Sequence, residues 1–202
     1  MSAIEILATS IGIVVAAVLT SNIVFSQSVG ICPLLGVSKK MDSAVGMGLA
    51  VTFVNTIAAV VCFALYQLLM RFELEYLDII TFILVIAALV QVLDIVLKKF
   101  SPTLYNALGV YLPLITTNCA IFLTVNMMVS EGYVAMDFGA GLLFTAVYAF
   151  AVGVGFLLAL VLMAGVRGKD EIALIPKPFR GFPIALIAAG LIALAFSGFL
   201  GL

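Results

Sequence analysis

The feature that most constrains this chain is the length of its uncharged apolar stretches. No charged residue separates Glu5 from Lys39, a run of 33 residues. A helix needs about 20 apolar residues to cross the hydrocarbon core of a bilayer. Of the 202 residues, 65% are hydrophobic and only 9% are charged, and the mean hydropathy is +1.37. Because soluble domains carry roughly a quarter charged residues, the composition predicts an integral membrane protein.

Charged and polar clusters divide the chain into six candidate membrane spans. These spans cover residues 4–36, 43–70, 79–97, 104–129, 138–166 and 181–201. Only short connections remain between them, so we expect a single all-α transmembrane domain over residues 1–202. The N-terminus lacks the basic segment of a signal peptide, and we expect it to belong to the mature chain.

The cations are distributed unevenly over the connections between these spans. Most of them follow the first, third and fifth spans: Lys39, Lys40, Lys98, Lys99, Arg167, Lys169, Lys177 and Arg180. The other connections hold Arg71 alone, together with several acidic residues. Short loops rich in lysine and arginine stay in the cytoplasm. We therefore expect both termini on the outer side of the membrane and the cation-rich connections in the cytoplasm, and with a net charge of −1 we expect no nucleic-acid partner.

The lengths of the uncharged stretches suggest an internal repeat. The first stretch of 33 residues and the fourth, residues 100–130, are both too long for one straight crossing. Each is followed by a medium and then a short stretch. Two halves of three spans enter the membrane from opposite sides, so we expect an inverted repeat of residues 1–99 and 100–202. Short echoes agree with it: "LTSNIVF" with "ITTNCAIF", and "GICPLL" with "GVYLPLI".

Both overlong stretches contain residues that interrupt helices. These are Ser26, Gln27, Ser28, Gly30, Pro33 and Gly36 in the first, and Gly109, Pro113, Thr116, Thr117 and Asn118 in the fourth. Irregular backbone at membrane depth is tolerated where protein or a cavity satisfies its polar groups. Paired interrupted helices in the two halves point to a binding site. We therefore predict that helices 1 and 4 are broken and that the breaks form the functional site.

Each of these two stretches carries one cysteine, Cys32 or Cys119. A free cysteine is most often a small buried apolar residue, and we interpret Cys62, in the unbroken "AVVCFAL", in that way. Cys32 and Cys119 are candidate ligands, because two thiolates are half of a four-cysteine [2Fe-2S] site. The chain contains no histidine, which argues against haem and requires that a second polypeptide supply the remaining ligands. Structural zinc normally uses close cysteine pairs and is less favoured.

The glycine runs "GMGLA" and "GVGF" indicate close helix packing. Dinucleotide fingerprints follow a β-strand, and no strand is expected here. We therefore expect no flavin or nicotinamide site in this chain.

Four segments carry a resemblance to a known family: "GICPLLGVSKKMDSAVGMGLA", "ITFILVIAALVQ", "SPTLYNALGVYLPLITTNCAIF" and "PFRGFPIALIAAGLIALAFSGF". They resemble the family of membrane subunits that includes the A-type subunit of the bacterial Rnf complex and the E-type subunit of the Na+-translocating NADH:quinone reductase (Nqr). The resemblance covers almost the whole chain. More distant members of the family are the E-type subunit of Rnf and the D-type subunit of Nqr.

The resemblance implies a cofactor, partners and a reaction. It implies a membrane-embedded [2Fe-2S] cluster shared with a homologous, oppositely oriented subunit of the Rnf E type, with Cys32 and Cys119 as this chain's ligands. Gly30, Pro33, Thr117 and Asn118 would surround the cluster. Such a complex, with further subunits of the B, C, D and G types, passes electrons between reduced ferredoxin and NAD+ and couples this transfer to pumping of Na+ or H+.

The path of the coupled ion is less constrained. Asp94, in "VQVLDIVLKKF", is the only acidic residue well inside an apolar run, and acidic residues within the membrane are candidates for ion paths. Lys98 follows four residues later, so the two also fit a helical ion pair near the cytoplasmic surface.

Two other functions fit the same pattern. One is a secondary transporter or ion channel with an inverted repeat, in which the cysteines are incidental. The other is a structural membrane anchor for soluble partners. Iron and sulfide analysis separates the transporter from the redox subunit.

Overall fold

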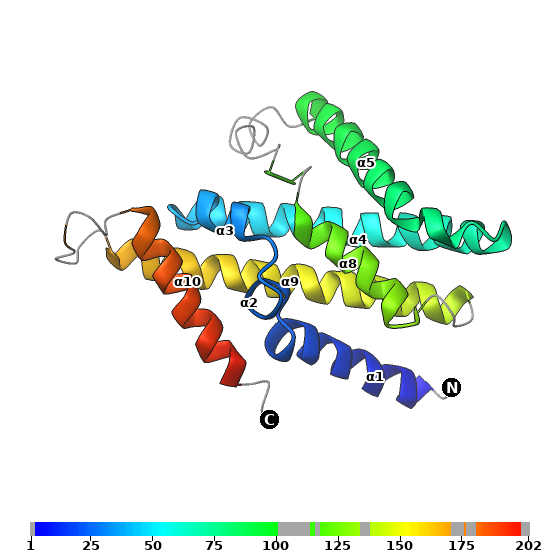
Figure 1. The fold of residues 1–202 in the computed structure, drawn as a ribbon, viewed down its shortest axis with the longest axis horizontal. Coiled ribbons are helices and arrows are strands. Elements are labelled where there is room, and N and C mark those ends of the chain that lie inside the picture. Colours follow the sequence, from blue (N-terminus) through cyan, green and yellow to red (C-terminus); the bar gives the residue numbers. More distant parts are fainter. Residues whose placement is uncertain are drawn as a thin grey trace.

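The structure, a computed structural model, describes residues 3–100, 114–115, 118–133, 138–170, 176 and 181–198. Within these ranges every regular element is helical, which confirms the all-α prediction (Figure 1). The longer helices are α1 (Ala3–Val15), α4 (Met41–Arg71), α5 (Asp78–Phe100), α8 (Cys119–Ser130), α9 (Phe138–Asp170) and α10 (Phe182–Ser197). The shorter ones are the π-helix η1 (Ala16–Thr20), α2 (Ile23–Ser26), α3 (Ile31–Val37) and the 3-10 helix η2 (Glu75–Leu77).

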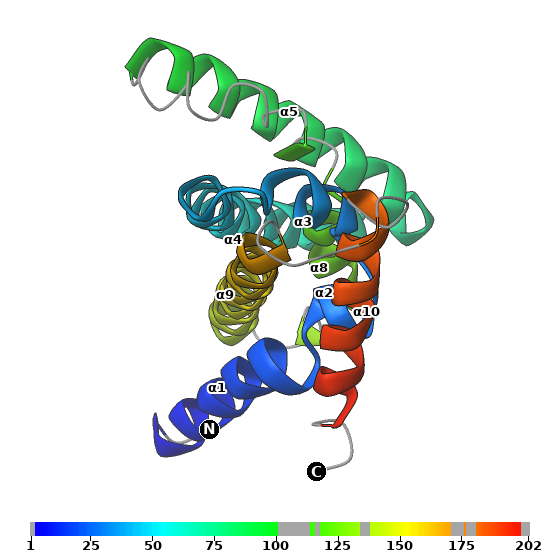
Figure 2. The ribbon, with the colours of Figure 1, turned by 90° about the vertical axis from the view of Figure 1, so that its left-hand side faces the viewer.

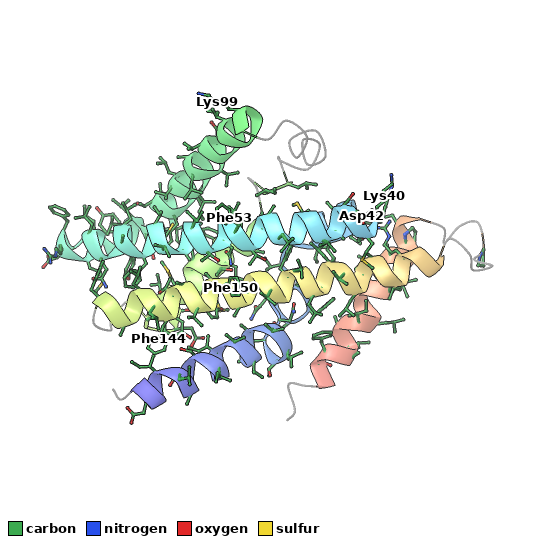
Figure 3. The ribbon with its side chains drawn as sticks, turned by 180° about the vertical axis from the view of Figure 1, so that it is seen from behind. Lys40, Asp42, Phe53, Lys99, Phe144 and Phe150 are labelled. Atoms are coloured by element: carbon green, nitrogen blue, oxygen red, sulfur yellow. The ribbon has the colours of Figure 1, made fainter. Side chains whose placement is uncertain are left out.

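Helices α4 and α9 form the centre of the molecule, lying side by side and running in opposite directions (Figures 1 and 3). They contain 31 and 33 residues, and both are long and apolar enough to cross a membrane. Small residues allow the close packing: a Cβ atom on Gly153 of α9 would lie 2.7 Å from the Cα atom of Thr52. A Cβ atom on Gly48 of α4 would similarly lie 2.8 Å from Leu157. The glycine runs therefore serve helix packing, as the sequence indicates.

Large apolar side chains cover much of the outer surface. Phe53 of α4 and Phe150 of α9 are 59% and 55% exposed (Figure 3). Exposed leucines and isoleucines also occur on α1, α5 and α10. Soluble monomers rarely expose such extensive apolar surface, whereas lipid tails solvate it without cost. Together with the two long apolar helices, this surface is that of a membrane protein.

The helices outside the central pair pack in a crosswise pattern. Helix α5 lies across α4, and α1 packs against α9 (Figure 2). The short helix α8, late in the chain, contacts α4 and α5 and also α9 of its own half. The short helix α2, early in the chain, contacts α9 and α10. Each short helix therefore packs on two helices from the opposite half of the sequence.

Cations at the ends of the two central helices are distributed unevenly. Because α4 and α9 are antiparallel, Lys40 at the start of α4 and Arg167 near the end of α9 are at the same end. Arg71, at the end of α4, and Glu131, just before α9, belong to the opposite end. This arrangement agrees with the partition of charges expected from the sequence.

Most predicted boundaries differ from the observed ones by a few residues, and the first span is broken, as predicted. The chain is interrupted twice there, at residues 21–22 and at residues 27–30. Ser28 and Gly30 have φ of +56° and +79° and produce the second interruption. Pro33 and Gly36, taken as helix breakers, lie within α3. Pro33 is in the first turn of α3, where its missing N–H costs little. Of the predicted fourth span, residues 104–129, the structure describes residues 114–115 and everything from Asn118 onward.

Candidate metal centre

The first interruption of the chain is organised by Asn22. Its backbone leaves the helical region (φ −59°, ψ 117°), and its side-chain Oδ1 accepts a hydrogen bond from the N–H of Val24 at 3.1 Å. An asparagine in this position caps the free N–H groups at a helix start. Asn22 therefore ends the first helical segment, α1 with η1, and starts α2.

Asn118 adopts the same arrangement at the start of α8. Its backbone has φ −74° and ψ 109°, and its Oδ1 accepts a hydrogen bond from the N–H of Ala120 at 3.0 Å. Asn22 and Asn118 are the asparagines of the two sequence echoes "LTSNIVF" and "ITTNCAIF". The echo therefore corresponds to a shared helix cap in the structure.

The amide nitrogens of these two asparagines have different surroundings. Asn22 Nδ2 donates to the carbonyl of Val18 at 3.1 Å and to the carbonyl of Gly155, on α9, at 2.9 Å. Asn118 is 4% exposed, and its Nδ2 has no hydrogen-bond acceptor within the described part of the chain. Leaving a buried donor unpaired costs about 1–3 kcal/mol, so the side chain of Asn118 stabilises its surroundings less than that of Asn22.

The second interruption of the first half meets the start of α8. The backbone N–H of Gly30 donates to Cys119 Sγ at 3.1 Å. Gly30 has φ of +79°, and a Cβ atom there would lie 2.7 Å from the Phe156 ring and 3.4 Å from Ala120. A larger residue is therefore excluded by both conformation and space. This contact brings together the two cysteine-bearing segments, which are 89 residues apart in sequence.

The three cysteines occupy two kinds of environment. Cys62 is fully buried inside α4, while Cys32 and Cys119 are exposed. Cys32 is in the first turn of α3 and lines a cavity of about 570 Å³, formed by Ile31, Cys32, Leu35, Gly36, Lys39, Arg167, Gly181 and Phe182. The separation of Cys62 from the other two agrees with the interpretation of it as a packing residue.

Arg167 fixes the segment that carries Cys32. Its guanidinium donates to the carbonyl of Leu35 at 2.7 Å and to the hydroxyl of Ser38 at 2.9 Å. These bonds join the end of α3 to the end of α9. Sequence reasoning treated Arg167 only as an orientation signal, because nothing local shows that a cation 129 residues later will reach Ser38.

Several predicted site residues are brought together and others lie outside the described part. Gly30 and Asn118 lie next to Cys119, and Pro33 is buried beside Cys32 in α3. Thr117 falls outside the described residues. Asp94 is on α5, but its side chain, like that of Lys98, is outside the described part, so its predicted roles stay predictions. Sequence reasoning missed Phe156, whose ring lies against Gly30.

The described residues can supply only part of a metal site. They contain no group of three or more histidine, cysteine, aspartate or glutamate side chains placed to hold a metal ion. The two exposed cysteines, with a backbone N–H donor already directed at one sulfur, fit half of a four-thiolate site. Clusters of this type have cysteine ligands whose sulfurs accept hydrogen bonds from the protein.

The fold and site together define a class of protein: a multi-helix membrane protein in which two interruptions of the chain meet beside exposed thiols. Comparison with known proteins identifies the family. The chain matches the family model described as "Rnf-Nqr subunit, membrane protein" over residues 10–202. The chain belongs to this family.

Individual relatives are similar along nearly their whole length. The chain is 48% identical over 191 residues to the A-type subunit of the ion-translocating oxidoreductase complex of Syntrophotalea carbinolica, covering 94% of this chain and 95% of the relative. It is also 48% identical over 195 residues to the A-type subunit of the Na(+)-translocating ferredoxin:NAD(+) oxidoreductase complex of Acetobacterium woodii, covering 96% and 98%. The A-type subunit of the ion-translocating oxidoreductase complex of Serratia proteamaculans is 48% identical over 189 residues, covering 93% and 94%.

Proposed function

We propose that this chain is a membrane subunit of an ion-translocating ferredoxin:NAD+ oxidoreductase complex of the Rnf type, and that it holds half of an intramembrane [2Fe-2S] cluster through Cys32 and Cys119. The names of its relatives support the first part, since they are A-type subunits of ion-translocating oxidoreductase complexes. The second part rests on the residues around the two sulfurs.

The observation that carries the proposal is the hydrogen bond from Gly30 N–H to Cys119 Sγ at 3.1 Å. Gly30 is two residues before Cys32, so this bond holds the two cysteine segments beside each other. Both cysteines are exposed and open to a second polypeptide, whereas Cys62 is enclosed in α4. Two thiolates from this chain require two more from a partner to complete a four-cysteine site.

When bound, a [2Fe-2S] cluster supplies a one-electron relay within the roughly 30 Å hydrocarbon core. This chain's residues contribute binding and environment. Cys32 and Cys119 supply the sulfurs, and Gly30 donates its N–H to the sulfur of Cys119. Phe156, which is buried against Gly30, makes this side of the site apolar. The fixed donor stabilises negative charge on the sulfur, which favours the reduced state.

The partner in this proposal is a homologous subunit in the opposite orientation. Three features of this chain support an internal duplication of the kind that relates such subunits. Helices α4 and α9 have similar lengths and are antiparallel. Asn22 and Asn118 form the same cap, and α2 and α8 pack on helices of the opposite half. We infer six spans in two inverted repeats, residues 1–99 and 100–202, within one transmembrane domain.

The orientation in the membrane follows from the charges. We infer that the end bearing Lys40 and Arg167 faces the cytoplasm and that both termini face outward across the bacterial cytoplasmic membrane. The ion moved by the complex is Na+ or H+; the Acetobacterium woodii relative is named as Na(+)-translocating. Asp94 is the candidate for the ion path in this chain.

The test uses serine variants of the three cysteines in the purified complex. Cys32→Ser and Cys119→Ser are expected to abolish the electron paramagnetic resonance (EPR) signal of the membrane cluster, because each removes one of four ligands. Cys62→Ser is the matched control and is expected to keep the signal. An unchanged spectrum in the first two variants would sink the ligand assignment, and absence of iron and sulfide from the wild-type membrane subunits would instead favour a transporter.

A further inference from the structure

We propose that the cavity between α3, α9 and α10 binds an anionic phospholipid, with the phosphate held by Lys39 and Arg167 and an acyl chain lying along the apolar wall. The inference uses the membrane family to which the chain belongs and the residues that line this cavity. It assigns no part to Cys32 and is therefore independent of the proposed cluster.

The cavity lies where three helices meet at one end of the central pair. Helix α3 leads into the start of α4, and both α3 and α10 contact α9, in the left half of Figure 1. The cavity has a volume of about 570 Å³, within the range of roughly 300–1,000 Å³ that is usual for ligand sites. Lys39 and Phe182 in its lining are exposed, so a ligand can enter from the surface.

The charged groups of the lining are of one sign. Lys39 and Arg167 are cations, and none of the described residues that line the cavity with them is acidic. Arg167 donates to the hydroxyl of Ser38, the residue before Lys39, at 2.9 Å, so the two cations belong to the same end of the cavity. Both bonds from Arg167 to this segment use Nη1, and a guanidinium has further N–H donors on its other nitrogens. The lining therefore favours an anion such as a phosphate.

The two cations lie at the depth of lipid headgroups. Helices α4 and α9 contain 31 and 33 residues, which gives lengths of about 46–50 Å at a rise of 1.5 Å per residue. The hydrocarbon core of a bilayer is only about 30 Å thick. Lys39 directly precedes the N-cap of α4, and Arg167 is in the last turn of α9. Both therefore lie outside the hydrocarbon core, where lipids carry their phosphates.

The neutral part of the lining favours a lipid over a free phosphate. Ile31, Leu35 and Phe182 give the cavity an apolar wall beside the cations, and Phe182 is 64% exposed. An acyl chain covers such a wall, whereas a free phosphate leaves it in contact with water. Basic pockets between membrane helices bind the headgroups of anionic lipids. A phospholipid therefore matches both the charge and the apolar wall.

The experiment uses the purified complete complex in phosphatidylcholine vesicles that contain a trace of photoactivatable phosphatidylglycerol. After illumination, mass spectrometry maps and quantifies the labelled peptides of this chain. We expect labelling of α3 and of the start of α10, with competition by unlabelled phosphatidylglycerol and none by inorganic phosphate. Lys39→Ala should reduce this labelling about fivefold. Lys40→Ala is the matched control, because Lys40 is also an exposed cation but does not line the cavity; a change of less than about twofold is expected.

Three results would overturn the inference. Equal labelling in Lys39→Ala and Lys40→Ala would show that the lipid contact is nonspecific. Competition by inorganic phosphate would assign the cations to a free anion. Absence of labelling in the wild-type complex would also refute the lipid, and a cross-link from a photoreactive amino acid in place of Phe182 to another polypeptide would then assign the cavity to a protein partner. These readouts do not involve iron or sulfide, so their failure is distinguishable from failure of the proposed function.

Discussion

The two helix starts at Asn22 and Asn118 share their local structure and differ in their surroundings. Each asparagine leaves the helical region and caps the following helix with its side-chain oxygen. Asn22 also reaches across to the carbonyl of Gly155 on α9. Asn118 makes no such bond within the described chain and stands directly before an exposed cysteine.

The difference shows how a repeated local signal takes on two roles. At Asn22 both side-chain polar atoms form hydrogen bonds within the chain, and the bond to Gly155 holds the start of α2 against α9. At Asn118 only the oxygen is used, and the helix that follows begins with Cys119. In the second half of the molecule, the Asn118 amide nitrogen has no acceptor among the described residues, and the adjacent Cys119 thiol contacts Gly30 of the first half.

The largest effect is expected at the contact between the halves. Gly30→Ala places a Cβ atom 2.7 Å from Phe156 in a backbone with φ of +79°, and should lower the free energy of unfolding by about 2–4 kcal/mol. Gly132→Ala is the matched control, because φ is +73° but nothing lies within 4 Å; about 1 kcal/mol is expected there. Thermal or urea unfolding in detergent measures both, and equal losses would mean that the contact with Phe156 is unimportant.

The next largest difference in unfolding free energy is expected between variants of the two asparagines. Asn22→Ala removes a cap and two further hydrogen bonds, to the carbonyls of Val18 and Gly155, so a loss of about 2–3 kcal/mol is expected. Asn118→Ala removes the cap alone and relieves an unpaired donor, so about 1 kcal/mol or less is expected. The same unfolding measurement applies, and a greater loss at Asn118 would contradict the comparison.

A smaller effect is expected from the other side of the Asn22 contact. In Gly155→Ala the added Cβ would lie 3.0 Å from the carbonyl oxygen of Ala17 and 3.2 Å from Asn22 Nδ2. Crowding of this kind should cost about 1–2 kcal/mol. Gly165→Ala, on the same helix with nothing within 4 Å, should be neutral or stabilising by about 0.5–1 kcal/mol. If both variants change the free energy of unfolding equally, the contact with α9 does not stabilise the start of α2 at Asn22.

The smallest effect is expected at the end of α3. Arg167→Ala removes the hydrogen bonds to Leu35 and Ser38, and because the arginine is partly exposed we expect a loss of only about 1 kcal/mol. Lys39→Ala removes an exposed cation from the same cavity and should change stability by less than about 0.5 kcal/mol. A larger loss from the lysine variant would show that charge, not the bonds to α3, matters at this end.

Much of this fold could be predicted because lipid excludes charged residues from the membrane spans, so that uncharged stretches mark the helices. Uncharged stretches predicted helices whose observed bounds are close to expectation, as for α9, predicted over 138–166 and observed as Phe138–Asp170. The interruption in the first half was predicted partly correctly, because Gln27, Ser28 and Gly30 lie in the observed break at residues 27–30. Ser26 is still in α2 and Pro33 and Gly36 are in α3, because proline is harmless in a first turn and one glycine does not end a helix. The earlier interruption at residues 21–22 was not predicted.

By itself, the sequence determined the membrane environment, the helical class, the candidate cysteines and the shared asparagine signal, since each of these depends on composition or on a few neighbouring residues. Only the tertiary structure decided that Gly30 meets Cys119, that Arg167 holds α3, and that the two asparagine nitrogens differ. The physical reason is that a hydrogen bond between residues 89 or 133 positions apart depends on how α4 and α9 pack, and no local pattern specifies that packing.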